Sequence, residues 1–499
     1  MQKRCLFLLG MVVFTTALFA QKVANVAIDK TNLSLRGGPV VVGQTTISTP
    51  GAGKVVLRFD GLCLSSPGDR IVLAASKTAN WGINDDCVEL ESANDDVNSN
   101  TFSHTRVYDV AAGDHTFYAV AENFYETDGS GIASLYGHLT AEWYPEEAGK
   151  PFARHIGIFS ENIPVEGAPV PFNVLTFNAP ESGKVLVRFD GKCVSSFGDL
   201  MYFAASNNIA WTNYEGSTSN EVIDNDLNRF SFSHARVYDV QPGNHSFYAV
   251  AENFFETYGN GFASIYGSLT AVFYPNSAAA KVSNTPVSTP FGVNTEGPIV
   301  TMAQANMNVP VSGKIVANFL GTGIGSFGDK VRIGLSGTQT WEPQDGSILL
   351  EPYSSDLNRT SFSQTRVYSV APGNHTYFAQ IQNVDEFEGS GLAVVYANLN
   401  LEYFPDGSVG QVEPAVLQSI KLYPNPASNW VRVEFPDLAT EEAEFFLIDS
   451  AGKVVKSLEK TGSDATNQMN WDVETLPKGV YFLQVRHASG TVMRTLVKM

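Results

Sequence analysis

The residues of this chain that could do chemistry recur with a spacing of 130 along the sequence. Asp and Asn stand two residues apart just before three predicted strands, and paired oxygen donors of this kind occur in calcium sites. An Asx turn that caps the strand entry is the alternative interpretation, and it is the favoured one. Calcium is therefore the one cofactor that the sequence leaves open. The pairs are Asp96 and Asn98, Asp226 and Asn228, and Asp356 and Asn358.

Two further repeated sets could bind a ligand. Trp81, Trp211 and Trp341 are equivalent, and a surface tryptophan near Asp and Asn could stack on a sugar ring. Most tryptophans belong to a core instead, so burial is the alternative. A loop with a Gly-x-Gly motif supplies carboxylates and amides, although a solvated hairpin would look the same. Its candidate ligand-binding residues are Glu122, Asn123, Glu252, Asn253 and Asn383.

The sequence contains no catalytic motif that we can identify. His-Glu-x-x-His, Gly-x-Ser-x-Gly and a phosphate-cradling Gly-Lys-Ser/Thr loop are all missing. Histidines recur at 115, 245 and 375 after a turn, where strand-start hydrogen bonding is the expected role. His104 and His234 become Gln364 in the third copy, so a general base there would be lost. We therefore predict no catalytic residues and no enzyme.

Tandem duplication explains the spacing. The tripeptide Arg-Val-Tyr begins at Arg106, Arg236 and Arg366, and the turns and loops around it keep the same offset. The sequence predicts repeats at 38–147, 167–277 and 297–406, separated by polar joins at about 146–166 and 276–296. A repeated Gly-Asp step could also bind a ligand, although a turn in each copy is the favoured interpretation; it stands at Gly68-Asp69, Gly198-Asp199 and Gly328-Asp329.

Hydrophobicity within each copy has a period of two and indicates strands. Val55, Leu57 and Phe59 form one core-facing row, and Gly/Asn/Asp turns separate such rows. The predicted fold class is all-β, with three antiparallel sandwich repeats of jelly-roll type. The segments 50–55 and 139–145 resemble C1q/TNF-like bacterial jelly rolls.

The last part of the chain, 417–499, is a different module. It opens with Tyr-Pro-Asn-Pro, continues with an Asp-x-x-Gly-Lys-Val hairpin that turns at 451–452, and contains a Lys-Gly-Val-Tyr strand before a basic terminus. It resembles the type A C-terminal sorting domain of type IX secretion cargo. The resemblance implies a small Ig-like β-sandwich, contact with the type IX secretion machinery, and passage through the outer membrane. The residues that carry it are Pro424, Asn425, Pro426, Asp449, Gly452, Gly479 and Tyr481.

Charge and the N-terminus also indicate export. The formal net charge of −19 argues against nucleic acid and anionic membranes as partners. Residues 1–20 have the basic, apolar and small-residue parts of a signal peptide, and no later segment predicts an integral membrane span. Cys63 and Cys193 are equivalent but Cys87 has no counterpart, which excludes a disulfide framework common to the repeats and leaves a local Cys63–Cys87 bond open.

The sequence thus predicts a secreted or cell-surface, non-enzymatic binding or adhesion protein with multivalent recognition of glycan or protein. A structural surface-layer component without a discrete ligand is the alternative, and accessory modules of a hydrolase are a weaker one. The third copy differs at Gln364, Gln382 and Gly323, which predicts weaker or different binding by that repeat.

Overall fold

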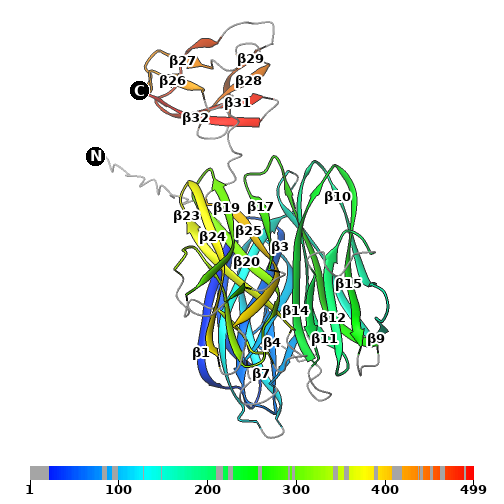
Figure 1. Cartoon of the computed structure of the whole chain (residues 1–499). Coiled ribbons are helices and arrows are strands. Elements are labelled where there is room, and N and C mark those ends of the chain that lie inside the picture. The colour runs from blue at the N-terminus through cyan, green and yellow to red at the C-terminus, as the bar shows by residue number, and fades with distance from the viewer. Residues whose placement is uncertain are drawn as a thin grey trace, which may run out of the picture. The chain divides into compact units, whose positions relative to one another are not determined.

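The computed structural model describes residues 22–499, apart from 81–86, 93–98, 127–128, 148, 210–216, 223–228, 257–260, 290–292, 295–297, 341–346, 353–358, 387–390, 407–418, 436–437, 439–441, 450–452, 461–466 and 488–489. The chain divides into two compact units, residues 1–407 and 408–499. The described secondary structure consists of β-strands with one short helical turn at Leu438, which confirms the predicted all-β class (Figure 1).

Each repeat of the first unit is a sandwich of two antiparallel sheets, and successive strands alternate between the sheets except for the fourth and fifth, which pair in one sheet. In repeat 1 the strand orders are β1-β8-β3-β6 and β2-β7-β4-β5. This alternation is the jelly-roll arrangement. The strands are β1 Val23–Ser34, β2 Val40–Thr49, β3 Gly53–Ser65, β4 Asp69–Ser76, β5 Val88–Glu91, β6 Ser99–Val110, β7 Gly113–Glu126 and β8 Ile132–Pro145.

Repeats 2 and 3 reproduce this order, with sheets β14-β11-β16-β9 and β10-β15-β12-β13, then β17-β25-β20-β23 and β19-β24-β21-β22. The stretches 146–166 and 276–296, which we expected to be joins, contain β9 and β17, the first strands of their sandwiches. Repeat 2 has β9 Phe152–Pro164, β10 Val170–Ala179, β11 Gly183–Val194, β12 Asp199–Ser206, β13 Thr218–Glu221, β14 Arg229–Val240, β15 Gly243–Glu256 and β16 Phe262–Pro275. Repeat 3 has β17 Lys281–Ser288, β18 Val293–Asn294, β19 Val300–Val309, β20 Gly313–Ile324, β21 Asp329–Ser336, β22 Ile348–Leu350, β23 Arg359–Val370, β24 Gly373–Glu386 and β25 Leu392–Pro405.

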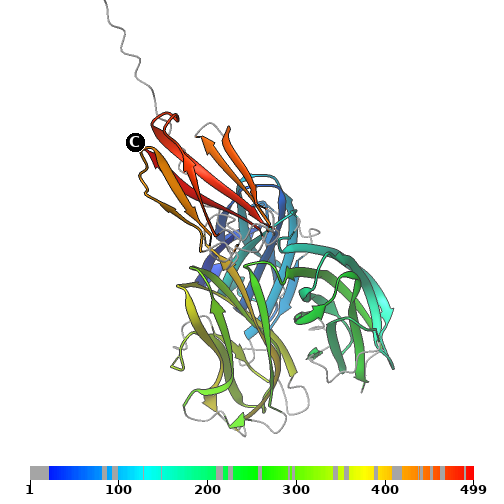
Figure 2. The ribbon, with the colours of Figure 1, turned by 90° about the horizontal axis from the view of Figure 1, so that it is seen from above.

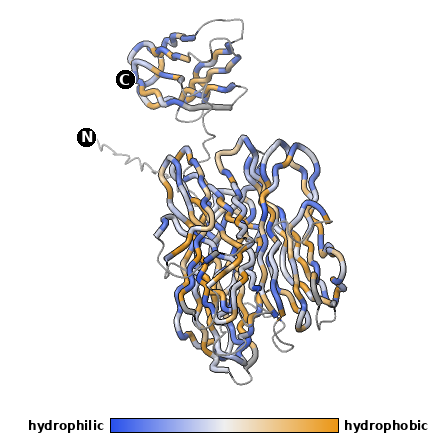
Figure 3. The backbone as a smooth tube through the Cα atoms, in the orientation of Figure 1, coloured by the Kyte–Doolittle hydropathy of each residue, from blue (hydrophilic) through white to orange (hydrophobic). Residues whose placement is uncertain are grey.

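The core of each repeat lies between its two sheets. Val55, Leu57 and Phe59 on β3 are fully buried there, as the period of two predicts. Polar and apolar segments alternate along the chain in Figure 3. The opposite face of β3 is buried as well, because it packs against the other repeats: Val56 shares a cluster with residues of all three copies. Burying one such large apolar side chain contributes roughly 1.5–3 kcal/mol.

The three repeats close into a ring. Equivalent glutamates at the end of β5, β13 and β22 each reach the next repeat. Arg229 Nη1 lies 3.5 Å from Glu91 Oε1, and Arg359 Nη1 lies 2.7 Å from Glu221 Oε1. Glu351 Oε2 accepts a hydrogen bond of 2.6 Å from Ser99 Oγ, which returns to the first repeat.

Head-to-tail contacts of one kind that close in this way give cyclic pseudo-symmetry. Figure 2 shows the blue, green and yellow-green sandwiches of the first unit grouped around a common centre. Each repeat therefore contacts both of the others.

The cysteines make no disulfide among the described residues. Cys63, Cys87 and Cys193 are buried thiols. Burial raises the pKa of Cys63 to about 12 and that of Cys193 well above its usual value. The prediction that the repeats fold without a shared disulfide framework is confirmed, and the Cys63–Cys87 bond does not form.

The second unit is a small sandwich with sheets β26-β27-β30 and β29-β28-β31-β32. Val431, Phe445, Leu483 and Leu496 lie in its core and are fully buried. The predicted small β-sandwich is thus present at the end of the chain. Its strands are β26 Lys421–Tyr423, β27 Trp430–Glu434, β28 Ala443–Asp449, β29 Val454–Lys460, β30 Gln468–Asp472, β31 Gly479–His487 and β32 Gly490–Lys498.

Candidate functional site

Two of the repeated polar sets meet at one end of each sandwich. In repeat 1 the buried Asp69 carboxylate accepts hydrogen bonds from Asn123 Nδ2 at 2.6 Å and from the backbone N of Gly131 at 3.0 Å. Asn123 Oδ1 accepts from the backbone N of Arg70 at 3.2 Å. Asp69, Asn123 and Gly131 form what we call the loop anchor, which fixes the end of β7 to the starts of β4 and β8.

Repeats 2 and 3 keep the Asp–Asn part of the loop anchor. Asn253 Nδ2 lies 2.7 Å from Asp199 Oδ1, and Asn383 Nδ2 lies 2.9 Å from Asp329 Oδ1. In repeat 3 the backbone N of Gly391 also donates to Asp329 Oδ2 at 3.2 Å. Desolvation raises the pKa of Asp199, although hydrogen bonds from Ser196 and Asn253 oppose it. From the sequence we predicted that Asn123, Asn253 and Asn383 bind a ligand. The structure instead uses their amides to hold the loop.

Exposed hydrophobic side chains flank every loop anchor. One follows the anchoring asparagine, and the other follows Gly131 or its equivalent in the other repeats. In repeats 1 and 3 both therefore lie next to groups that bind the same aspartate. Their exposed fractions range from 39% to 48%, in all three copies. We call these six residues the loop-end patch: Phe124 and Ile132, Phe254 and Phe262, and Val384 and Leu392.

Single scattered apolar residues are common on protein surfaces, whereas here two exposed apolar side chains lie at the same end of each repeat and remain apolar in all three copies. The sequence analysis missed the patch. The sequence does contain apolar residues at both positions in all three copies. It does not show that their side chains are exposed, because apolar residues in a strand are normally expected in the core.

Glu122 and Glu252, the remaining described members of the predicted binding loop, are half-buried on the outer faces of β7 and β15. Desolvation raises the pKa of both carboxyls. They point away from the sandwich core, since the neighbouring residues of the strands, Ala121 and Ala251, face inward.

The structure does not describe the remaining predicted ligand residues. Trp81, Trp211 and Trp341 lie outside the described residues, as do Asp96, Asn98, Asp226, Asn228, Asp356 and Asn358. Among the residues that the structure does describe, no group of three or more His, Cys, Asp or Glu side chains is placed to hold a metal ion.

The repeated histidines have structural partners. The Nε2 atoms of His115, His245 and His375 lie 2.7–2.8 Å from the carbonyl oxygens four residues earlier, which confirms their predicted strand-start role. His104 Nδ1 and His234 Nδ1 each accept a backbone N–H from the opposite sheet at 2.9 Å.

The third copy keeps this bond with a different side chain, because Gln364 Oε1 accepts from the backbone N of Leu335 at 2.7 Å. Burial lowers the pKa of His234 to about 3, so it accepts this bond as a neutral ring. The His-to-Gln change therefore preserves a hydrogen bond between sheets.

A cluster of buried charged and polar side chains lies at the centre of the ring. Arg58 Nη2 lies 3.1 Å from Glu142 Oε1 and 3.9 Å from Glu402 Oε1, and all three side chains are 1% exposed. The hydroxyl of Tyr144 is 2.9 Å from Glu142 Oε2, and that of Tyr274 is hydrogen-bonded to Glu402. We call these five residues the axial cluster. It joins all three repeats.

The axial cluster predicts a pH-dependent stability. Desolvation and then the charge of Glu142 raise the pKa of Glu402 from 4.5 to about 7, although Arg58 and Arg188 oppose this. The folded protein thus holds this proton more tightly than the unfolded chain, so the stability that Glu402 contributes is complete below pH 4.5 and is lost as the pH rises to about 7. Glu402→Gln removes the titration.

We expect the difference in free energy of unfolding between the unchanged protein and Glu402→Gln to shift in favour of the variant by on the order of 3 kcal/mol between pH 4.5 and 7.5. Urea unfolding at several pH values measures this difference. A difference that stays constant over the range would contradict the assignment.

The Tyr-Pro-Asn-Pro opening of the second unit holds the end of the chain. Asn425 Nδ2 donates to the carbonyl of Thr495 at 2.7 Å, and Asn425 Oδ1 accepts from the backbone N of Val497 at 2.9 Å. Pro424 and Pro426 flank this asparagine on an exposed turn. The motif therefore fixes β32, the last strand.

The other motif residues support the same sandwich. Asp449 Oδ1 accepts from the backbone N of Lys453 at 2.9 Å across the predicted hairpin, and Tyr481 OH donates to the carbonyl of Pro477 at 2.8 Å. Gly479 begins β31. Gly452 lies outside the described residues. No described helix has the length and apolar character that crossing a membrane requires.

Solved structures that resemble parts of the chain share little with it. A β-glucuronidase of Faecalibacterium prausnitzii is 11% identical, with a TM-score of 0.15, over 39% of this chain and 36% of its own, so the chain spans about a third of it. The adhesin domain of Epf from Streptococcus pyogenes is 12% identical, over 39% of this chain and 70% of its own, with a TM-score of 0.17. A structure from Sulfolobus Turreted Icosahedral Virus is 10% identical, over 77% and 91%, with a TM-score of 0.17. Scores this low carry no argument about fold or function.

No curated protein matches the chain in sequence. Residues 421–499 do match a protein family, the one described as secretion system C-terminal sorting domain. The match covers all seven strands of the second unit, including the turn built by Asn425. Residues 421–499 are therefore a C-terminal sorting domain, and the chain is a cargo protein of the type IX secretion system that is exported to the cell surface or released from the cell.

Proposed function

We propose that the first unit is a non-enzymatic, multivalent binding or adhesion unit that attaches to a protein or glycan outside the cell. The loop-end patch is the observation that carries this proposal. Each repeat presents two exposed hydrophobic side chains beside a rigid loop anchor, and such side chains contribute most when they enter a partner's pocket.

Ring closure supports multivalency. Because the three repeats are related by cyclic pseudo-symmetry, their equivalent ends face the same side of the unit. Three weak contacts to one surface can then act together and raise avidity by roughly 10² to 10⁴ if the ligand spans them. Val384 stands where the first two repeats have Phe124 and Phe254, which favours weaker binding by the third repeat.

The test uses the mature full-length protein on arrays of immobilised extracellular matrix proteins and of glycans. The variant replaces Ile132, Phe262 and Leu392 together with serine. We expect its binding to fall at least about 10-fold, since burial of one such side chain contributes roughly 1.5–3 kcal/mol.

The matched control replaces Val41 and Val174 with serine, because these residues are 39% and 41% exposed on β2 and β10, outside the patch. Equal binding by the patch variant and the control would overturn the assignment of the patch. Absence of binding to every immobilised protein and glycan would instead favour the structural surface-layer alternative.

A further inference from the structure

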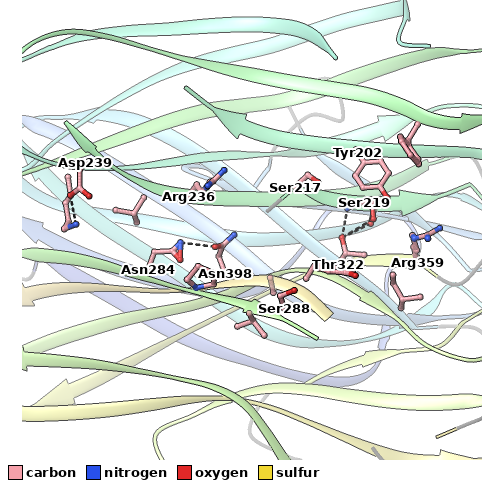
Figure 4. Close-up of a pocket in the computed structure, with 18 residues that line it drawn as sticks. Tyr202, Ser217, Ser219, Arg236, Asp239, Asn284, Ser288, Thr322, Arg359 and Asn398 are labelled. Carbon is pink, nitrogen blue, oxygen red and sulfur yellow. Dashed lines mark hydrogen bonds and ion pairs between the residues drawn. The ribbon is translucent and has the colours of Figure 1, made fainter. Parts of the chain in front are cut away.

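A cavity of about 890 Å³ lies between repeats 2 and 3. Figure 4 shows residues from both repeats around it, with Tyr202 and Ser219 on one side and Thr322 and Asn398 on the other. Small-molecule sites usually measure about 300–1,000 Å³ and combine hydrophobic and aromatic side chains with a few convergent polar groups. The walls here include residues of strands β11, β12, β13, β14, β15, β17, β20, β23 and β25.

Short side chains open this cavity. Thr322 Oγ1 accepts a hydrogen bond from the backbone N of Ser219, and the two hydroxyls lie 3.3 Å apart. At the junction of repeats 1 and 2 the equivalent positions hold Glu89 and Lys192, which form an ion pair. Arg229 Nε adds a contact of 3.3 Å to the same glutamate. The equivalent residues at the third junction are both leucine, Leu349 and Leu62.

The charged residues that line the cavity are three cations and one carboxylate. Lys184 Nζ pairs with Asp239 Oδ1 at 2.7 Å, and Arg359 Nη1 pairs with Glu221 Oε1, just outside the lining, at 2.7 Å. Arg236 contributes the third positive charge, and its guanidinium lies 5.6 Å from the centre of the Tyr238 ring. This arginine can make a charge-assisted contact with an anionic ligand.

The uncharged lining suits a sugar. Tyr202, Phe254 and Tyr396 contribute aromatic surface, on which a pyranose ring can stack. Asn284 Nδ2 donates to Asn398 Oδ1 at 2.9 Å, and these amides retain further donor and acceptor capacity for hydroxyl groups. Hydroxyls of Ser217, Ser219, Ser288 and Thr322 add to this set.

From this combination we propose that the cavity between repeats 2 and 3 binds an acidic saccharide, a pyranose that bears a carboxylate. The aromatic side chains contact the ring, the amides and hydroxyls bind its hydroxyl groups, and the Arg236 guanidinium pairs with the carboxylate. This single site goes beyond the proposed multivalent function. It shares Phe254 with the loop-end patch but none of the three positions changed in the test of that patch.

The test measures binding of saccharides to the mature full-length protein by calorimetry or saturation-transfer NMR. A glucuronic acid disaccharide and sialyllactose represent the two sources of a pyranose carboxylate, and lactose is the neutral comparison. We expect at least one acidic saccharide to bind, and lactose to bind at least about 10-fold more weakly, because a charge-assisted bond to arginine is lost. The relative affinities of the two acidic saccharides identify the source.

Two variants locate the site. Arg236→Gln is expected to reduce binding of the acidic saccharide at least about 10-fold. Its matched control is Arg106→Gln, the equivalent residue of repeat 1, whose guanidinium lies 5.4 Å from the Tyr108 ring and whose loss should leave binding unchanged. The second variant, which we call the filled variant, combines Ser219→Glu with Thr322→Lys; it copies the Glu89–Lys192 pair of the first junction and places two long side chains in the cavity between β13 and β20.

The filled variant should retain the melting temperature of the unchanged protein and lose saccharide binding. The proposal is overturned if neither acidic saccharide binds, if lactose binds equally well, or if Arg236→Gln and Arg106→Gln behave alike. The triple serine variant of the loop-end patch should still bind the saccharide, so failure of the proposed function and failure of this site give different results.

Discussion

Replacing Arg58 with methionine is expected to lower the free energy of unfolding of the first unit by about 3–5 kcal/mol. Arg58 is 1% exposed and lies between the carboxylates of Glu142 and Glu402, which are equally buried. Methionine fills a similar volume but leaves the carboxyl group of Glu142, and that of Glu402 in its ionised form, without their cation. Urea unfolding of the mature protein, followed by hydrogen exchange of peptides from β3 and β25, measures the loss in this unit.

An exposed ion pair provides the control. Lys184 and Asp239 are 43% and 81% exposed, so Lys184→Met should cost only about 0–1 kcal/mol. Adding Glu402→Gln to Arg58→Met removes one of the stranded carboxylates and should restore part of the stability. A single Arg58→Met variant within about 1 kcal/mol of the unchanged protein would contradict a role for the axial cluster in holding the repeats together.

Deletion of 421–499 is expected to leave the protein in the periplasm. The leader expected at 1–20 would still direct passage through the inner membrane, whereas the sorting domain that matches these residues would be gone. Immunoblots of the periplasm, outer membrane and medium from a bacterium with type IX secretion measure the distribution.

A point variant, Asn425→Ala in the full-length protein, tests the same role with a smaller change than the deletion. It removes both hydrogen bonds between the Tyr-Pro-Asn-Pro turn and β32, and it should reduce export without abolishing synthesis. Export of the truncated chain at the level of the unchanged protein would contradict the role of the second unit.

Strand periodicity predicted the core but not the contacts between repeats. Val55, Leu57 and Phe59 face the core as expected, yet Val56 and Arg58 on the other face are also buried. A period of two describes one sandwich and contains no information about what covers its outer side. An arginine inside a predicted strand, such as Arg58, is normally expected to face solvent, so the sequence did not indicate that it is buried between repeats.

The joins were misread for a related reason. β9 is an edge strand whose residues are mostly exposed, so its sequence lacks the alternation that marks a half-buried strand. The loop anchor shows the same limit in the candidate site. Asp69 and Asn123 recur with equal regularity, and regular spacing alone could not distinguish residues that bind each other from residues that bind a ligand.

Fusion of three repeats in one chain releases the centre of the ring from exact symmetry. A homotrimer would carry three copies of each axial residue, so three like charges would meet wherever one was placed. Here the position of Arg58 holds Arg188 and Asn318 in the other copies, and that of Glu142 holds Val272 and Glu402. Because one chain contains all three repeats, each axial residue can be substituted in one repeat alone, and the charge at the axis of the ring can change by a single residue. In a homotrimer of a single repeat, every substitution would appear three times.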